Sequence, residues 1–174
     1  MSTISTYKEP KDVLFKLLRE GWRTWIADNF VEKSDHFFNY CITAHSLRDW
    51  CIKYLSLSGE DVTKFHTEIN LIDYMAESRD IANSSKHFKL ASLLVKSAFP
   101  TMSDFVTIKG EENQIDYELT KRPDIVISLS NGDTIDLFGF LNKTSSGWID
   151  VLKRKSIPSE DKFDPIYMFV EYRK

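Results

Sequence analysis

Residues 79 to 87 combine side chains suited to acid–base and phosphate chemistry within about two and a half helical turns. The stretch reads Arg79-Asp80-Ile81-Ala82-Asn83-Ser84-Ser85-Lys86-His87. At about 100° per residue, Arg79, Asn83 and Lys86 share a sector roughly 60° wide, and His87 lies at its edge. Histidine exchanges protons near neutral pH, and a cation offsets negative charge on phosphate. We therefore predict a site in which His87 carries a proton, Asn83 orients the reacting group, and Arg79 and Lys86 face an anion.

A second group of polar residues lies earlier in the chain, at His45, Arg48 and Asp49. His45 and Asp49 are one helical turn apart, so the carboxylate could orient the imidazole or hold its proton. Any of the three could face residues 79–87, and we expect them as secondary site residues. Both groups also have a structural interpretation: His45 as a core histidine with its bonds satisfied, and residues 83–85 as the fraying end of a helix.

Other chemistries lack their motifs in this sequence. It contains no Gly-rich phosphate loop, no His-Glu-x-x-His and no Gly-x-Ser-x-Gly. The 2 cysteines, Cys41 and Cys51, and the 4 histidines are scattered without the spacing of a zinc site. We therefore expect no metal and no cofactor.

The elements that must position these residues are helices in the first half of the chain. Apolar residues recur there at three- and four-residue spacing, which predicts helices. The predicted helices cover Pro10–Val31, Ser34–Leu57, Asp61–Ile69 and Asn70–Phe88. Ser34 is the expected N-cap of the second helix.

The second half of the chain changes to a period of two, which predicts strands. The expected strands are Phe105–Ile108, Ile115–Leu119, Asp124–Ser130, Thr134–Leu141 and Ile166–Tyr172, with a short helix around Trp148 and Leu152. Asn131-Gly132 predicts a tight hairpin turn. We expect an α+β fold. Residues 1–99 form an antiparallel helical bundle, and residues 100–174 form a small antiparallel sheet with a short helix, packed on the bundle as one unit.

Composition limits the class of protein and of partner. The chain has 174 residues, of which 42% are hydrophobic and 28% charged, as in soluble globular proteins. Its net charge of -3 excludes a globally basic coat for nucleic acids but leaves room for a local basic patch. No apolar run approaches the roughly 20 residues that span a bilayer, and no signal peptide is visible. We expect a cytoplasmic protein with reduced cysteines and no membrane contact.

Residues 79–87 resemble the motif of HEPN domains (higher eukaryotes and prokaryotes nucleotide-binding), which are helical nuclease domains. Their motif is Arg-Asn-x-x-x-His, often extended to Arg-Asp-x-Arg-Asn-x-x-x-His. This chain matches the extended form at Arg79, Asp80, Asn83 and His87 and departs from it at Ala82, where the family has its catalytic Arg. The resemblance covers about the first 90 residues.

The resemblance implies metal-independent RNA cleavage by a homodimer, in a toxin–antitoxin or phage-defence setting. His87 would act on the ribose 2′-hydroxyl or the leaving oxygen, and Arg79 or Lys86 would replace the missing Arg. The chain would then be either an active endoribonuclease or a degenerate relative of one. This hypothesis predicts that Asn83 and His87 line a cleft.

Two other functions stay open. The first is a non-enzymatic protein-interaction or dimerisation module, which Ala82, the acidic balance and the 13% aromatic content favour. It predicts a large apolar surface away from residues 79–87. The second is a sensor of a small ligand or nucleotide, which predicts an enclosed pocket containing His87 and His45.

Overall fold

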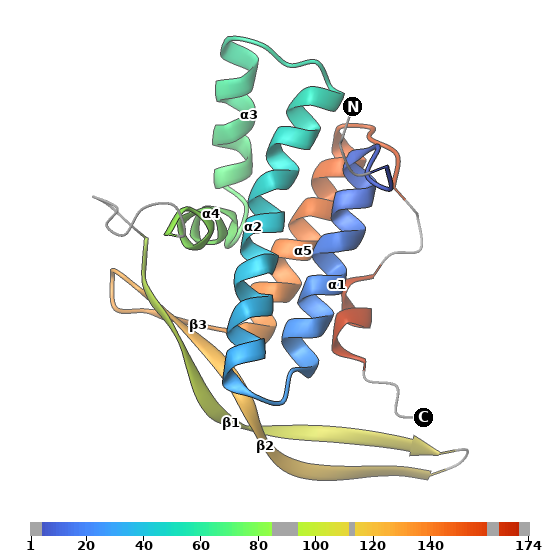
Figure 1. The fold of residues 1–174 in the computed structure, drawn as a ribbon, viewed down its shortest axis with the longest axis vertical. Coiled ribbons are helices and arrows are strands. Elements are labelled where there is room, and N and C mark those ends of the chain that lie inside the picture. The colour runs from blue at the N-terminus through green and yellow to red at the C-terminus, as the bar shows by residue number, and fades with distance from the viewer. Residues whose placement is uncertain (1–4, 85–93, 112–113, 160–163, 171–174) are drawn as a thin grey trace.

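The computed structural model describes residues 5–84, 94–111, 114–159 and 164–170. It combines a helical body with an antiparallel sheet of three strands, which confirms the α+β class (Figure 1). The elements are α1 (Pro10–Ile26), α2 (Phe30–Tyr54), α3 (Glu60–Asn70), α4 (Met75–Ser84), β1 (Val95–Glu111), β2 (Gln114–Leu129), β3 (Thr134–Asp136), α5 (Leu137–Arg154) and a 3-10 helix η1 (Pro165–Phe169). Within the described residues, no helix is both long and apolar enough to cross a membrane.

The first two helices meet at a turn that the apolar pattern does not reveal. The predicted helix through Val31 ends at Ile26 instead, and α2 begins at Phe30 rather than at Ser34. The cause is Asn29, whose side chain accepts a hydrogen bond from the Glu32 backbone at 2.9 Å and caps α2. Ser34 lies inside the helix, where its hydroxyl donates to the Phe30 carbonyl.

The core of the helical body joins both halves of the sequence. Tyr40 of α2 is fully buried, and its hydroxyl contacts the Leu141 carbonyl at 2.9 Å and the Ser145 hydroxyl at 2.8 Å, both on α5. Gly21 of α1 allows this packing, because a Cβ there would lie 3.2 Å from the Tyr40 ring and 2.5 Å from the Met168 sulfur. The helix of the second half is therefore part of the main core.

The strand predicted over Thr134–Leu141 is wrong in its second half. The chain turns into α5 at Leu137, because the Asp136 carboxylate accepts a hydrogen bond from the Gly139 backbone at 2.7 Å and caps the helix. The final predicted strand is also wrong, since residues 165–169 form η1. The hairpin at Asn131-Gly132 is confirmed, since it joins β2 to β3 with Gly132 at a φ of 96°. The turn is wider than the tight two-residue type I′ turn that Asn-Gly favours, because Asn131 lacks the positive φ that such a turn requires.

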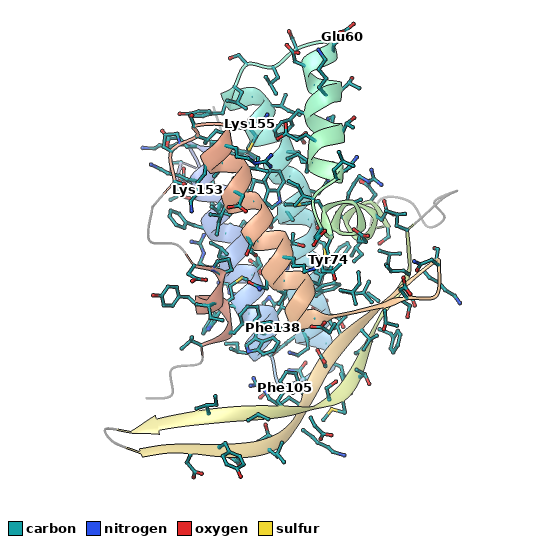
Figure 2. All side chains as sticks on the ribbon, turned by 180° about the vertical axis from the view of Figure 1, so that it is seen from behind. Glu60, Tyr74, Phe105, Phe138, Lys153 and Lys155 are labelled. Atoms are coloured by element: carbon teal, nitrogen blue, oxygen red, sulfur yellow. The ribbon has the colours of Figure 1, made fainter. Side chains whose placement is uncertain are left out.

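The predicted strands Phe105–Ile108 and Ile115–Leu119 are the outer parts of one long ribbon formed by β1 and β2. We call residues 103–111 and 114–122 the arm, which extends along one end of the helical body (Figure 1). Trp25 of α1 holds it there, with its ring 5.3 Å from Phe105 and 6.0 Å from Phe138. Figure 2 shows Phe105 and Phe138 between the arm and the helices.

Candidate functional site

The polar residues of α4 bind one another and the start of the sheet. Arg79 donates from Nε and Nη2 to Asp80 Oδ1, at 3.2 and 2.8 Å. The other oxygen of this buried carboxylate, Oδ2, accepts the Leu94 backbone N–H at 2.7 Å. The Arg79 guanidinium is thus held by its neighbour, and Asp80 links α4 to the residue that precedes β1.

Position 82 faces the interior, where Ala82 is only 3% exposed. A larger, charged side chain at this position would be buried against the core. Asn83, the next residue, is half-buried. Lys86 and His87 lie outside the described residues, so the predicted pairing of His87 with Asn83 stays a prediction.

Arg48 lies inside the protein and ties three elements together. It is 2% exposed, and it donates to the Asn70 side chain at 2.7 Å and to the Met75 carbonyl at 3.0 Å. Burial lowers its pKa to about 10; Arg79 nearby lowers it too, whereas Asp49 raises it. The structure therefore brings Arg48 and Arg79 close enough for their charges to interact. The bonds of Arg48, however, join α2 to the ends of α3 and α4.

The remaining secondary residues sit on the same helix with different surroundings. His45 is half-buried and Asp49 is exposed. Asp49 acts electrostatically on Arg48. A crevice of about 290 Å³ lies between α2, α4 and β1, and its described lining includes none of His45, Arg48 and Asp49. Its described lining includes Asp80 and Ser84 together with Phe37, Ile81 and Val95.

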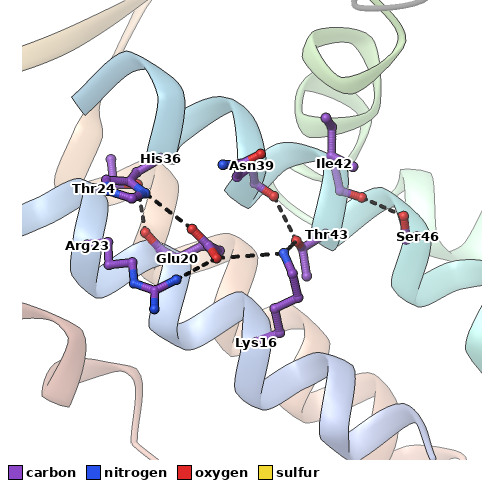
Figure 3. Close-up of polar contacts among 9 residues, drawn as sticks. All are labelled: Lys16, Glu20, Arg23, Thr24, His36, Asn39, Ile42, Thr43 and Ser46. Carbon is purple, nitrogen blue, oxygen red and sulfur yellow. Dashed lines mark hydrogen bonds and ion pairs between the residues drawn. The ribbon is translucent and has the colours of Figure 1, made fainter. Parts of the chain in front are cut away.

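A buried carboxylate that the sequence reading missed lies between α1 and α2 (Figure 3). Glu20 is surrounded by Arg23 at 2.9 Å, His36 at 3.4 Å and Lys16 at 3.7 Å. Lys16 also donates to the Thr43 hydroxyl at 2.6 Å, and burial lowers its pKa while Glu20 raises it. The charged groups of this cluster contact one another, so the cluster stabilises the packing of α1 against α2. The sequence feature that could have revealed this cluster is a glutamate among the residues of the buried face of α1.

Lys33 is a second buried charge that the sequence reading missed. Its ammonium donates to the Thr24 and Trp25 carbonyls at 2.8 and 3.1 Å, which satisfies two carbonyls in the last turn of α1. Burial lowers its pKa, Arg122 of β2 adds to this effect and Asp124 opposes it, so that the pKa is about 8. Lys33 therefore ties α2 to the last turn of α1.

The arm presents apolar side chains in directly opposed pairs. Val106 pairs with Leu119, and Ile108 pairs with Tyr117. Because opposed residues and residues two apart share one side of a ribbon, these four form one surface, which we call the outer face. They are 62 to 73% exposed.

The same side of the ribbon is buried closer to the helices. Ile125 and Ile127, on the side of β2 that carries Leu119, are covered by the helical body. Further out the ribbon twists, so that Phe105 on its opposite side contacts Trp25 and the outer face points to solvent. The alternation of Ile115, Tyr117 and Leu119 predicted the strand. Nothing in it revealed that the helices end before covering this face.

The described residues contain no group of three or more His, Cys, Asp or Glu side chains that could hold a metal ion. Comparison with known proteins finds no family model, no curated protein and no solved structure that matches this chain.

Proposed function

We propose that this protein is a non-enzymatic interaction module that binds a partner protein through the outer face of its arm. The observation that carries the proposal is the cross-strand surface of Val106, Ile108, Tyr117 and Leu119, which is apolar and exposed. Contiguous apolar patches on soluble proteins mark interaction sites, whereas single exposed apolar residues do not. An isolated two-stranded ribbon is only marginally stable in water, so a partner that covers this face also stabilises the arm.

The polar residues of the helical body support a structural role for that part of the chain. Arg79 is bonded to Asp80, Arg48 to Asn70 and the Met75 carbonyl, and Lys33 to the end of α1. The bonds of Arg48 and Lys33 join separate helices, and Asp80, which Arg79 holds, accepts the Leu94 backbone N–H just before β1. If the arm is the binding surface, these polar residues serve to stabilise the helical body that carries it.

A crosslinking experiment tests the proposal. A photoreactive amino acid replaces Leu119 in one variant and Leu71 in a control, because Leu71 is an 82%-exposed leucine on the helical body. We expect light to attach one defined protein to position 119 in the cells that produce the chain, and none to position 71. Equal labelling at both positions, or none at position 119, contradicts the proposal.

RNA cleavage is the second candidate, and the resemblance of residues 79–87 to the HEPN motif supports it, together with the proximity of Arg48 and Arg79. The test is incubation of the purified protein with labelled RNA in EDTA, beside a His87→Ala variant. Cleavage that disappears in the variant would support a metal-independent ribonuclease. Absence of cleavage by the folded wild-type protein, or equal cleavage by both proteins, contradicts it.

A further inference from the structure

We infer that the partner of the outer face is a second copy of this chain, whose arm packs face to face on the first with both arms pointing the same way. The inference rests on the proposed function, since it names the occupant of the same surface. It draws on three observations: the outer face lies on the side of the ribbon that the core covers further along, the charges on that side are self-complementary, and the overall charge of the arm is acidic.

The outer face continues a surface that the chain already covers with its own residues. Along β2, one side of the ribbon carries Ile127 and Ile125 under the helices. Further out, beyond the exposed Lys121, the same side carries Leu119 and Tyr117 in solvent. The described residues provide no third strand and no helix over the outer part. The exposed half therefore has the apolar character of a core-facing sheet and lacks its cover.

The charged pair next to the apolar pairs favours the same arm of a second copy as the partner. Asp104 pairs directly with Lys121, on the same side of the ribbon as Val106 and Leu119, and both are exposed. Each directly opposed pair of residues forms one row of the arm. A two-fold axis that runs along the arm, between the two copies, places each row opposite the same row of the partner subunit, with β1 facing β2. Val106 then meets Leu119 of the partner subunit, and Asp104 meets Lys121 of the partner subunit. The same two-fold rotation therefore brings apolar residues opposite apolar residues and acidic residues opposite basic ones.

The charge of the arm argues against other classes of partner. Residues 103–122 contain five acidic and three basic residues, which gives a net charge of -2. A nucleic acid or an anionic lipid surface would be repelled by this balance. A second arm avoids this repulsion at the contact, because the paired Asp104 and Lys121 of each copy lie opposite residues of the other sign.

The size of the contact predicts a dimer that dissociates on dilution. The rows from Asp104 to Ile108 span about 13 Å at roughly 3.3 Å per residue. A standard interface buries about 800 Å² on each partner, which is more than this short face provides. The association is therefore expected to depend on concentration.

Sedimentation equilibrium over about three decades of protein concentration tests the inference. We expect the wild-type chain to dimerise, and Asp104→Lys and Lys121→Asp each to dimerise at least about tenfold more weakly, because like charges then meet across the interface. Leu71→Lys is the control and should match the wild type. Circular dichroism establishes that each variant is folded.

The decisive step is to mix the Asp104→Lys chain with the Lys121→Asp chain. In the mixed dimer every 104–121 contact between subunits again joins opposite charges, so we expect dimerisation close to the wild-type strength. Mixing cannot repair damage within either chain. If one charge variant does not fold, the Leu119→Lys variant takes its place, and it should be monomeric at concentrations where Leu71→Lys is dimeric.

Three results overturn the inference: a wild-type chain that stays monomeric, charge variants that dimerise like the wild type, or a mixture that gains nothing. The crosslinking experiment separates these from failure of the proposed function. If position 119 labels a different protein while the chain is monomeric, the second copy is wrong and the interaction role stands. If position 119 labels nothing, the interaction role is wrong as well.

Discussion

Arg48 shows at the scale of one residue how the helical body uses its charges. Its guanidinium reaches Asn70 and the Met75 carbonyl at the same time. A lysine presents a point charge and cannot reproduce this fork. We predict that Arg48→Lys lowers the free energy of unfolding by about 2 kcal/mol, because one buried acceptor is left without its donor. Urea denaturation measures the change.

The control for this prediction is the same substitution on the surface. Arg154 of α5 forms an ion pair with Glu68 at 3.1 Å, with its side chain 53% exposed. Exposed pairs contribute little, so Arg154→Lys should change the free energy of unfolding by less than about 0.5 kcal/mol. Equal effects of the two substitutions would show that Arg48 is not a structural tie.

Lys33 makes stability depend on pH in the alkaline range. In the folded protein its pKa is about 8, whereas the pKa of an unperturbed lysine is 10.5. Between these values the unfolded chain binds more protons, so the free energy of unfolding rises with pH, by at most about 3 kcal/mol. We predict that this rise is present in the wild type and absent in Lys33→Met, as measured by urea denaturation at pH 8 and pH 10.

The comparison of the two proteins isolates Lys33 from other groups. Burial raises the pKa of Tyr40, Cys41 and Cys51, which lowers stability as the pH rises. These residues are common to the wild type and the variant, so their effect cancels in the difference. A difference that stays constant from pH 8 to pH 10 would contradict the account of Lys33.

The sequence draws attention to polar residues of α2 and α4 but not to the bonds that they make. Arg79, Asn83 and Arg48 were selected from residue type and helical spacing, and Arg79 does act electrostatically on Arg48. That they form a site stays a prediction. Their bonds could not be foreseen, because Asn70 and the Met75 carbonyl reach Arg48 only through the turn between α3 and α4. Glu20 and Lys33 were missed because charged residues are rarely buried.

At the scale of elements, the start of α5 depends on a single cap. The Asp136 carboxylate accepts the backbone N–H of Gly139, in the first turn of the helix, at 2.7 Å. We predict that Asp136→Ala lowers the melting temperature and costs about 1 kcal/mol of stability. Asp150→Ala, an exposed position later in α5, serves as the control and should stay within about 0.5 kcal/mol of the wild type. Similar losses in both variants would contradict the role of the cap.

The sequence predicted an element correctly where one local pattern, such as a turn dipeptide or an alternation of apolar residues, had no competing pattern beside it. The turn at Asn131-Gly132 and the alternation through Leu119 were identified correctly, since backbone conformation and a period of two are local properties. The break at Asn29 was missed because Ser34 offers an equally good cap. The stretch from Leu137 was read as a strand because its β-forming residues outweighed the cap at Asp136.

At the scale of the whole molecule, the helices cover only part of the ribbon. Ile125 and Ile127 are buried under the helical body, whereas the outer face lies beyond that cover and is exposed. Figure 1 shows the arm extending along one end of the helices. Where a core ends depends on helix lengths and packing angles, which no local pattern records. The sequence therefore predicted the strands of the arm but not that their apolar side would be exposed, and this exposure is the basis of the proposed function.

Hydrogen exchange of the wild-type protein at low and high concentration tests the central claim most directly. If a second arm covers the outer face, backbone exchange in residues 104–108 and 117–121 slows as the concentration rises, and exchange in α3 does not change. Arm amides that exchange at the same rate at every concentration, or a slowing confined to the helices, would contradict the claim that a second copy of the chain covers the outer face.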